Sequence, residues 1–194
     1  MKIVIFGDSH CGPLSVARKS SPLSAQIEVH GSDGRNWAAP SVSVEDDGYW
    51  RFRAQALGEI RPLDLRLKPD DALYVFSSPL HTAPYVRSKV WETYCPWQVA
   101  ELHPSQMPLP DAVIHSWVDT SLASRLAILD RMRAAGFNLV VVEAPRPLAR
   151  TPDKLRRSAD LMRAVDNICR EHINALLRER GLQTIFVPDE AIEA

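Results

Sequence analysis

The sequence predicts an α/β fold, a three-layer α/β/α sandwich around a parallel sheet of about five strands. Five short apolar runs support this, at 2–6, 27–30, 72–76, 138–143 and 183–187. The first, third and fourth runs are almost continuous in Val, Ile, Leu and Phe, as strands covered on both faces are. Helical patterns lie between runs, and an alternation of strands and helices implies a parallel sheet with helices on both faces.

Two helical patterns flank the fourth run. The first carries its apolar residues on a single stripe, formed by Leu122, Leu126, Leu129 and Met132. We expect this helix to begin at Asp119 or Thr120, either of which can cap it, and to end at Gly136. The second pattern occupies 151–182, and Gly181 ends it. Each helix leads directly into an apolar run, as expected for parallel strands.

Length and composition favour one ordinary globular domain spanning 1–194. The chain has 194 residues and a formal net charge of −1, and its basic residues are scattered, so we predict no nucleic-acid partner. No apolar run approaches the roughly 18 residues of a membrane span, and no signal peptide is recognisable, so no membrane association is expected. Three widely separated cysteines, Cys11, Cys95 and Cys169, favour a reduced, cytoplasmic setting.

Two stretches depart from the alternation of strands and helices. Residues 37–70 are expected to hold a short hairpin or a helix. Residues 84–118 are rich in proline and form an insertion, and long ordered loops of this kind often serve as lids over a site. Trp91 and Trp97 lie in this possible lid and are predicted to line a substrate pocket, with simple packing as the alternative.

The residues that follow the strands carry the chemistry, because ligands of open α/β sheets bind beyond the carboxyl ends of the strands. Gly7-Asp8-Ser9 follows the first run. A helix is expected to begin there, so the Ser9 hydroxyl can act as a nucleophile while its N–H stabilises an oxyanion. Arg146 follows the fourth run between two prolines, and we expect a surface salt bridge there, with an anionic substrate as the alternative partner.

With Gly7-Asp8-Ser9 after the first strand, a glycine after the second and Ala-Pro-Arg-Pro after the fourth, the chain resembles the SGNH (GDSL-type) hydrolases. The resemblance extends over the order of elements along nearly the whole chain. It implies a flavodoxin-like fold, Ser9 as the nucleophile, and the N–H groups of Ser9 and Gly34 as the oxyanion hole, with Gly31 as the alternative to Gly34. It also implies a small-molecule or carbohydrate ester as substrate, with no cofactor and no metal. Asp8 and His10 are the predicted substrate contacts beside the nucleophile.

The chain departs from the family pattern at two blocks. The family's Gly-x-Asn-Asp block is replaced by SSPLH at 77–81, which contains no asparagine. The family's Asp-x-x-His block, which supplies the base, does not occur before Ala194, and we expect it in a segment beyond this residue. Within the chain, His81 is the best-placed base, because it leaves the third strand beside the first.

Two alternatives remain open from the sequence. Asp8 and His10 also match the Asp-x-His that opens the calcineurin-like metallophosphoesterases, which predicts a metal-dependent phosphoesterase. The further ligand motifs of that class, Gly-Asp-x-x-Asp, Gly-Asn-His and Gly-His-x-His, are absent from the sequence. The third possibility is a non-catalytic binding protein with the same fold, which the two departures from the family pattern favour.

Overall fold

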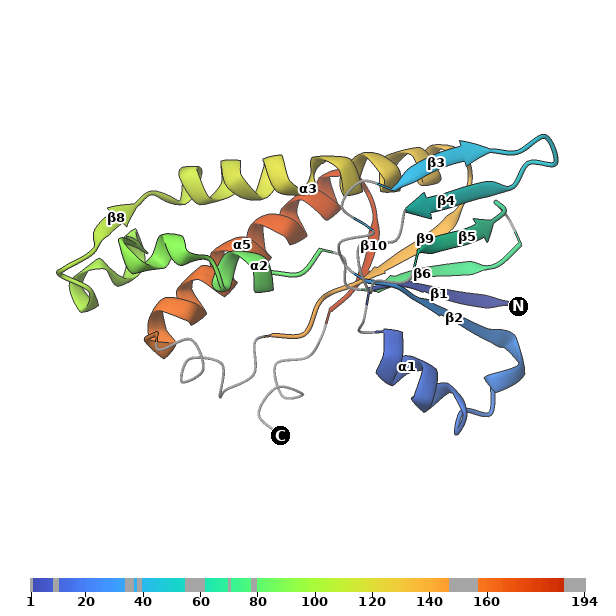
Figure 1. Ribbon diagram of the computed structural model, residues 1–194, viewed down its shortest axis with the longest axis horizontal. Helices are drawn as coiled ribbons and strands as arrows, with labels where there is room; N and C mark the ends of the chain where they lie inside the picture. The colour runs from blue at the N-terminus through green and yellow to red at the C-terminus, as the bar shows by residue number, and fades with distance from the viewer. Residues whose placement is uncertain are drawn as a thin grey trace.

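A five-stranded parallel sheet forms the centre of the protein in the computed structural model (Figure 1). The structure describes residues 2–8, 11–33, 37, 40–54, 62–69, 71–77, 80–146 and 157–186. The strands are β1 (Ile3–Gly7), β2 (Ile27–Gly31), β6 (Leu73–Ser77), β9 (Asn138–Val142) and β10 (Gln183–Ile185). Their order in the sheet is β2-β1-β6-β9-β10, and neighbouring strands are parallel. The predicted α/β class and the five predicted strands are confirmed.

The two faces of this sheet differ in their burial. Four side chains of β1 and β6 on one face are at most 2% exposed: Val4, Phe6, Tyr74 and Phe76. On the other face Ile5 and Val75 are half-buried. In the sheet, β2 lies on one side of β1, whereas β6, β9 and β10 follow one another on its other side. Right-handed crossovers therefore place helix α1 (Cys11–Arg18) on one side of the sheet and the later connections on the other.

A second, antiparallel sheet packs on the more buried face. Its strands are β3 (Ser41–Val44), β4 (Trp50–Ala54) and β5 (Leu63–Leu67). The Trp50 ring centroid lies 5.4 Å from that of Phe137, and Trp37 lies between Phe52 and Phe76, at 6.2 and 5.3 Å. Strands β3 and β4 form the hairpin that was one of the two expectations for 37–70, and β5 extends it to a sheet. Part of this layer is therefore β-sheet, unlike the helical layer that an α/β/α sandwich has.

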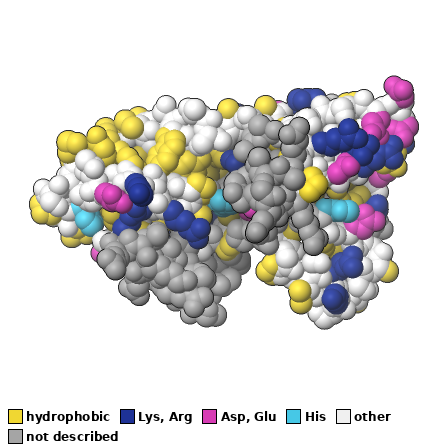
Figure 2. Space-filling model, viewed as in Figure 1, with side chains coloured by type: hydrophobic (Ala, Val, Ile, Leu, Met, Phe, Trp, Pro, Cys, Tyr) yellow, Lys and Arg dark blue, Asp and Glu magenta, His cyan; other side chains and the backbone are white. Residues whose placement is uncertain are grey.

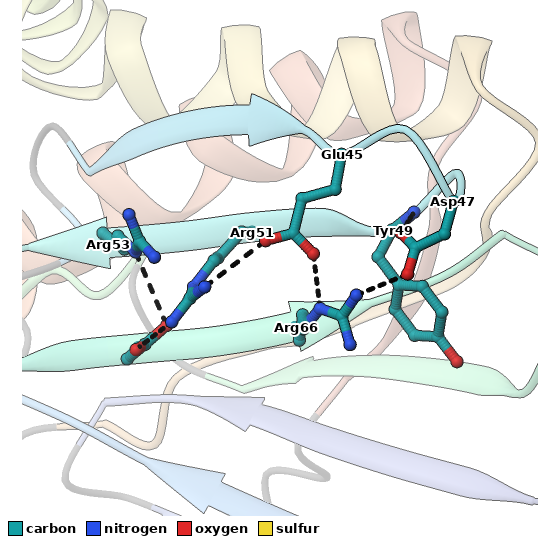
Figure 3. Close-up of polar contacts among 7 residues, drawn as sticks. Glu45, Asp47, Tyr49, Arg51, Arg53 and Arg66 are labelled. Carbon is teal, nitrogen blue, oxygen red and sulfur yellow. Dashed lines mark hydrogen bonds and ion pairs between the residues drawn. The ribbon is translucent and has the colours of Figure 1, made fainter.

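Charged side chains of both signs cover the outer face of the antiparallel sheet (Figure 3). Arg51 binds the Asp64 carboxylate through Nε and Nη2, at 2.8 and 2.7 Å. Arg66 binds Glu45 at 2.5 Å and Asp47 at 2.6 Å. The hydrogen bonds from Arg51 hold the pKa of Asp64 below its ordinary value. Figure 2 shows these charges gathered over the sheet, so this is a solvated face rather than a buried one.

The insertion at 84–118 is built from short, ordered elements. They are α2 (Ala83–Val86), η3 (Lys89–Glu92), β7 (Tyr94–Pro96), η4 (Trp97–Leu102) and β8 (Met107–Leu109). Strands β7 and β8 pair in parallel. The insertion also includes the first two turns of α3 (Asp111–Ala134). Its role as a lid stays a prediction.

Helix α3 begins earlier than expected, at Asp111 rather than at 119 or 120. Ile114 and Val118 are both buried and extend the apolar stripe toward the N-terminus, so the extra turns are stabilised by packing. Helix α5 (Ala159–Glu179) is capped by the Ser158 hydroxyl and ends before Gly181, as expected. None of the helices in the described part of the chain has both the length and the apolar character that crossing a membrane requires.

Candidate functional site

The carboxyl ends of β1 and β6 form the most favourable position for a site. These two strands are neighbours, and the chain leaves them toward opposite sides of the sheet, with α1 after β1 and α3 after β6. Such a reversal opens a crevice beyond the strand ends, where ligands of open α/β sheets bind. Asp8 directly follows β1, and His81 lies four residues after the end of β6. The topology therefore brings two predicted site residues to the same edge.

Close contact between β1 and β6 fixes the backbone at this edge. A Cβ atom on Gly7 would lie 1.9 Å from the Ser77 carbonyl oxygen, so only glycine fits there. The N–H of Asp8 donates to the same oxygen at 3.3 Å. The Gly7 carbonyl accepts from the buried indole Nε1 of Trp37 at 2.8 Å and from the Ser32 N–H at 2.9 Å. The chain therefore reaches Asp8 from a rigidly held strand end.

Asp8 and His81 lie side by side at this edge. The Asp8 residue is only 2% exposed, and its Oδ2 lies 3.6 Å from Nε2 of His81, whose side chain is 25% exposed. Nδ1 of His81 is enclosed by protein atoms. A carboxylate beside an imidazole fixes the orientation of the ring and stabilises its protonated form, which is what a general base requires. The pair can therefore accept a proton from a neighbouring hydroxyl group.

Cys11 lies at the same edge, but its thiol is poorly suited to act as a nucleophile. Its backbone N–H donates to the Asp8 carbonyl at 3.0 Å, and the residue is 1% exposed. Burial, followed by the negative charge of Asp8, raises the pKa of the Cys11 thiol from 9.0 to about 11. The thiolate is the reactive form of cysteine, so this thiol is inert near neutral pH.

We expect the free energy of unfolding to fall as the pH rises from about 9 to about 11. The folded-state pKa values of Cys11 (about 11) and Cys169 (about 12) both exceed 9.0. In this window the unfolded chain loses thiol protons that the folded chain retains, so the unfolded state gains stability. Urea unfolding at a series of pH values measures the slope of the free energy of unfolding against pH. Cys11→Ala should make the slope shallower, and an unchanged slope would contradict the assignment to Cys11.

The other predicted site residues fall in three places. Ser9, His10 and Gly34 lie outside the described residues. Trp91 is 2% exposed, and its Nε1 donates to the Tyr85 carbonyl at 2.7 Å, so it packs inside the insertion. Trp97 is 69% exposed at the start of η4. The structure thus brings Asp8 and His81 together, while the two tryptophans have quite different surroundings.

Sequence reasoning missed a buried cluster of charges next to this edge. The salt bridge expected at Arg146 is present, and its side chain is 29% exposed, but its partner at 3.2 Å is the buried carboxylate of Asp166. Arg170 is 7% exposed; it binds Asp166 at 3.3 Å and donates to the Ala144 carbonyl at 2.7 Å. Arg170 also pairs with Glu143 at 3.1 Å. The signal in the sequence is an Asp and an Arg four residues apart, on a helix stripe that is otherwise apolar.

A small cavity lies between β9 and α5, and Asp8 is not part of its lining. Thr82, Glu143, Arg170 and Asn174 contribute polar groups to its wall, together with apolar residues of β9 and α5. Its volume is about 10 Å³, which leaves room for about one water molecule. This cavity is therefore a packing feature of the charged cluster and not a pocket for an organic substrate.

A metal centre finds no support in the described residues: they contain no group of three or more His, Cys, Asp or Glu side chains arranged to hold a metal ion. His10, one of the two ligands that the sequence suggested, lies outside them. Comparisons with protein-family models, with curated proteins and with solved structures found no match to this chain.

Proposed function

We propose that the protein is a serine-dependent ester hydrolase of the SGNH type, with Ser9 as nucleophile and His81 as general base. The observation that carries the proposal is the pair formed by the buried Asp8 carboxylate and His81, 3.6 Å apart. Ser9 follows Asp8 directly in the sequence. The strand order β2-β1-β6-β9-β10 supports the flavodoxin-like part of the resemblance, since that arrangement places the second strand beside the first and the others in sequence.

In the proposed mechanism, His81 accepts the hydroxyl proton while Ser9 Oγ attacks the ester carbonyl carbon. Asp8 faces Nε2, which keeps its N–H toward the carboxylate, so the lone pair of Nδ1 is the one that accepts the hydroxyl proton. The N–H groups of Ser9 and Gly34 bind the oxyanion of the tetrahedral intermediate. The carbon–oxygen bond to the alcohol then breaks, and the alcohol leaves with the proton from His81. Water, deprotonated by His81, attacks the acyl-enzyme and releases the carboxylic acid and free Ser9.

We further propose that the substrate carries a small acyl group, such as acetyl, on a carbohydrate or another alcohol. Carboxylic ester hydrolysis by this route needs only a nucleophile, a base and oxyanion donors, so it uses no cofactor. The proposed enzyme is thus distinguished from a phosphoesterase using Asp8 and His10, which would need metal ions to stabilise the attacking and leaving oxygens.

Labelling with a fluorophosphonate probe tests this proposal, because the probe reacts only with an activated serine. We expect one labelled peptide, modified at Ser9, and we expect a chelator to leave both the labelling and the hydrolysis of p-nitrophenyl acetate unchanged. Labelling that spares Ser9 would contradict the proposal. Chelator-sensitive hydrolysis of bis-p-nitrophenyl phosphate would instead favour the phosphoesterase. No labelling and no hydrolysis would favour the non-catalytic binding protein.

A further inference from the structure

The chain just after His81 is tied to helix α5 by a buried carboxylate. Asp166 is 2% exposed, and one of its oxygens accepts a hydrogen bond from the hydroxyl of Thr82, which is 3% exposed. The two residues are 84 positions apart in the sequence. Thr82 is the residue next to His81, so this contact fixes the backbone from which the imidazole extends.

The environment of Asp166 keeps its carboxylate in a single position. Arg170, one turn further along α5, reaches both carboxylate oxygens through Nε and Nη2, each at 3.3 Å. Arg146, which follows β9, binds the carboxylate at 3.2 Å and the Asn167 side chain at 2.5 Å. A buried carboxylate is retained only when it is paired and hydrogen-bonded, and here two guanidinium groups and a hydroxyl satisfy it.

The Thr82 hydroxyl does not cap helix α2, although Thr82 is the residue that precedes this helix. Thr82 is the N-cap residue of α2, where a threonine hydroxyl commonly accepts a hydrogen bond from the helix backbone. Here the hydroxyl makes no such bond, and the N–H groups of Tyr85 and Val86 donate to the Thr82 carbonyl instead. The second residue of α2, Pro84, has no N–H to offer, so the hydroxyl serves Asp166 and takes no part in capping α2.

We propose that Asp166 is a positioning residue, which holds His81 beside Asp8 by binding the Thr82 hydroxyl. Its effect on catalysis rests on the proposed function, whereas its effect on the placement of the His81 ring does not. Asp166 acts at a distance, through Thr82, and touches no reacting atom. A displacement of about 1 Å in a catalytic group can lower the rate by about a hundredfold, so a tether one residue away from the base has a measurable effect.

The test compares Thr82→Val with Thr82→Ser. Valine preserves the shape of threonine and removes the hydroxyl, while serine keeps the hydroxyl and removes only a methyl group. We expect Thr82→Val to lower kcat for p-nitrophenyl acetate by about tenfold to a hundredfold with a smaller change in KM, and Thr82→Ser to retain most of the activity. A merely structural role of the hydroxyl would not separate kcat from KM in this way.

A second readout is independent of activity. Diethyl pyrocarbonate acylates accessible neutral imidazoles, and peptide mass spectrometry gives the rate at each histidine. We expect acylation of His81 to become several-fold faster in Thr82→Val and to stay unchanged in Thr82→Ser. His30, on the edge strand β2 two strands away from β6, has a side chain 44% exposed and serves as the internal standard. If Thr82→Val does not fold, Thr82→Ala, which adds no bulk, takes its place in the same comparison.

The outcomes separate the two proposals. Unchanged acylation of His81 in Thr82→Val would overturn the positioning role, and so would equal acceleration at His81 and His30, which indicates general loosening. If the wild-type protein hydrolyses no ester while acylation of His81 responds to Thr82→Val alone, the positioning role stands and the proposed function falls. If Ser9 is labelled and the two Thr82 variants behave like the wild type, only the positioning role falls.

Discussion

Ser9→Ala is expected to lower kcat/KM for p-nitrophenyl acetate by at least about 10³-fold, because it removes the only group that can form the acyl-enzyme in the proposed mechanism. The oxyanion donors are backbone N–H groups, which alanine retains, so a small residual rate above the uncatalysed one should survive. Initial rates at several substrate concentrations, with the enzyme concentration fixed by absorbance, measure the loss. The free energy of unfolding should change little, since the substitution removes a single oxygen atom.

The matched control is Ser15→Ala, which removes a serine hydroxyl from helix α1, six residues along the chain. This variant should keep wild-type activity. His81→Gln provides the companion loss of activity, because glutamine keeps polar atoms near Asp8 but cannot accept a proton at neutral pH. Equal activity of wild type and Ser9→Ala would exclude Ser9 as the nucleophile, and the esterase proposal would fall with it.

The parallel sheet was predictable because buried parallel strands leave a simple trace in the sequence. Each of β1, β6 and β9 contains a run of four consecutive apolar residues, since one face is buried and the other at least half-buried. In 37–70 the β3–β4 pair is the expected hairpin, whereas the third antiparallel strand, β5, was not predicted although it too has a trace. Leu63–Leu67 reads Leu-Asp-Leu-Arg-Leu, an alternation with the period of a strand that has one buried face.

Part of the candidate site was likewise predictable from the sequence, and part was not. Asp8 and His81 could be placed together because each closely follows a strand, and adjacent parallel strands bring their carboxyl ends to one edge. The tether through Asp166 could not be placed, because it joins a loop and a helix 84 residues apart. The Asp and the Arg four residues apart on the apolar stripe of α5 indicate a paired charge on the buried face, but they do not identify Thr82 as a partner. Only the packing of α5 against the strand ends brings Asp166 to Thr82.

Gly7→Ala is expected to destabilise the fold by about 3 kcal/mol or more, beyond the usual cost of an extra methyl group in a core. The added Cβ would lie 1.9 Å from the Ser77 carbonyl oxygen and 2.8 Å from its carbonyl carbon, both of which are backbone atoms. A side chain could rotate away from such a clash, but a backbone carbonyl in the centre of a sheet cannot. Strands β1 and β6 would have to separate where Asp8 and His81 meet.

Gly12→Ala is the matched control for Gly7→Ala, because it adds the same methyl group where there is space for it. Gly12 lies in helix α1, only five residues from Gly7, and a Cβ built there meets nothing within 4 Å. Alanine is favoured over glycine in a helix by roughly 0.5–1 kcal/mol, so this variant should be as stable as the wild type or more so. Urea denaturation of the three proteins gives the ranking Gly12→Ala, wild type, Gly7→Ala. A Gly7→Ala protein as stable as the wild type would mean that β1 and β6 do not approach each other so closely, and the proposed site would lose the rigid backbone that brings Asp8 to His81.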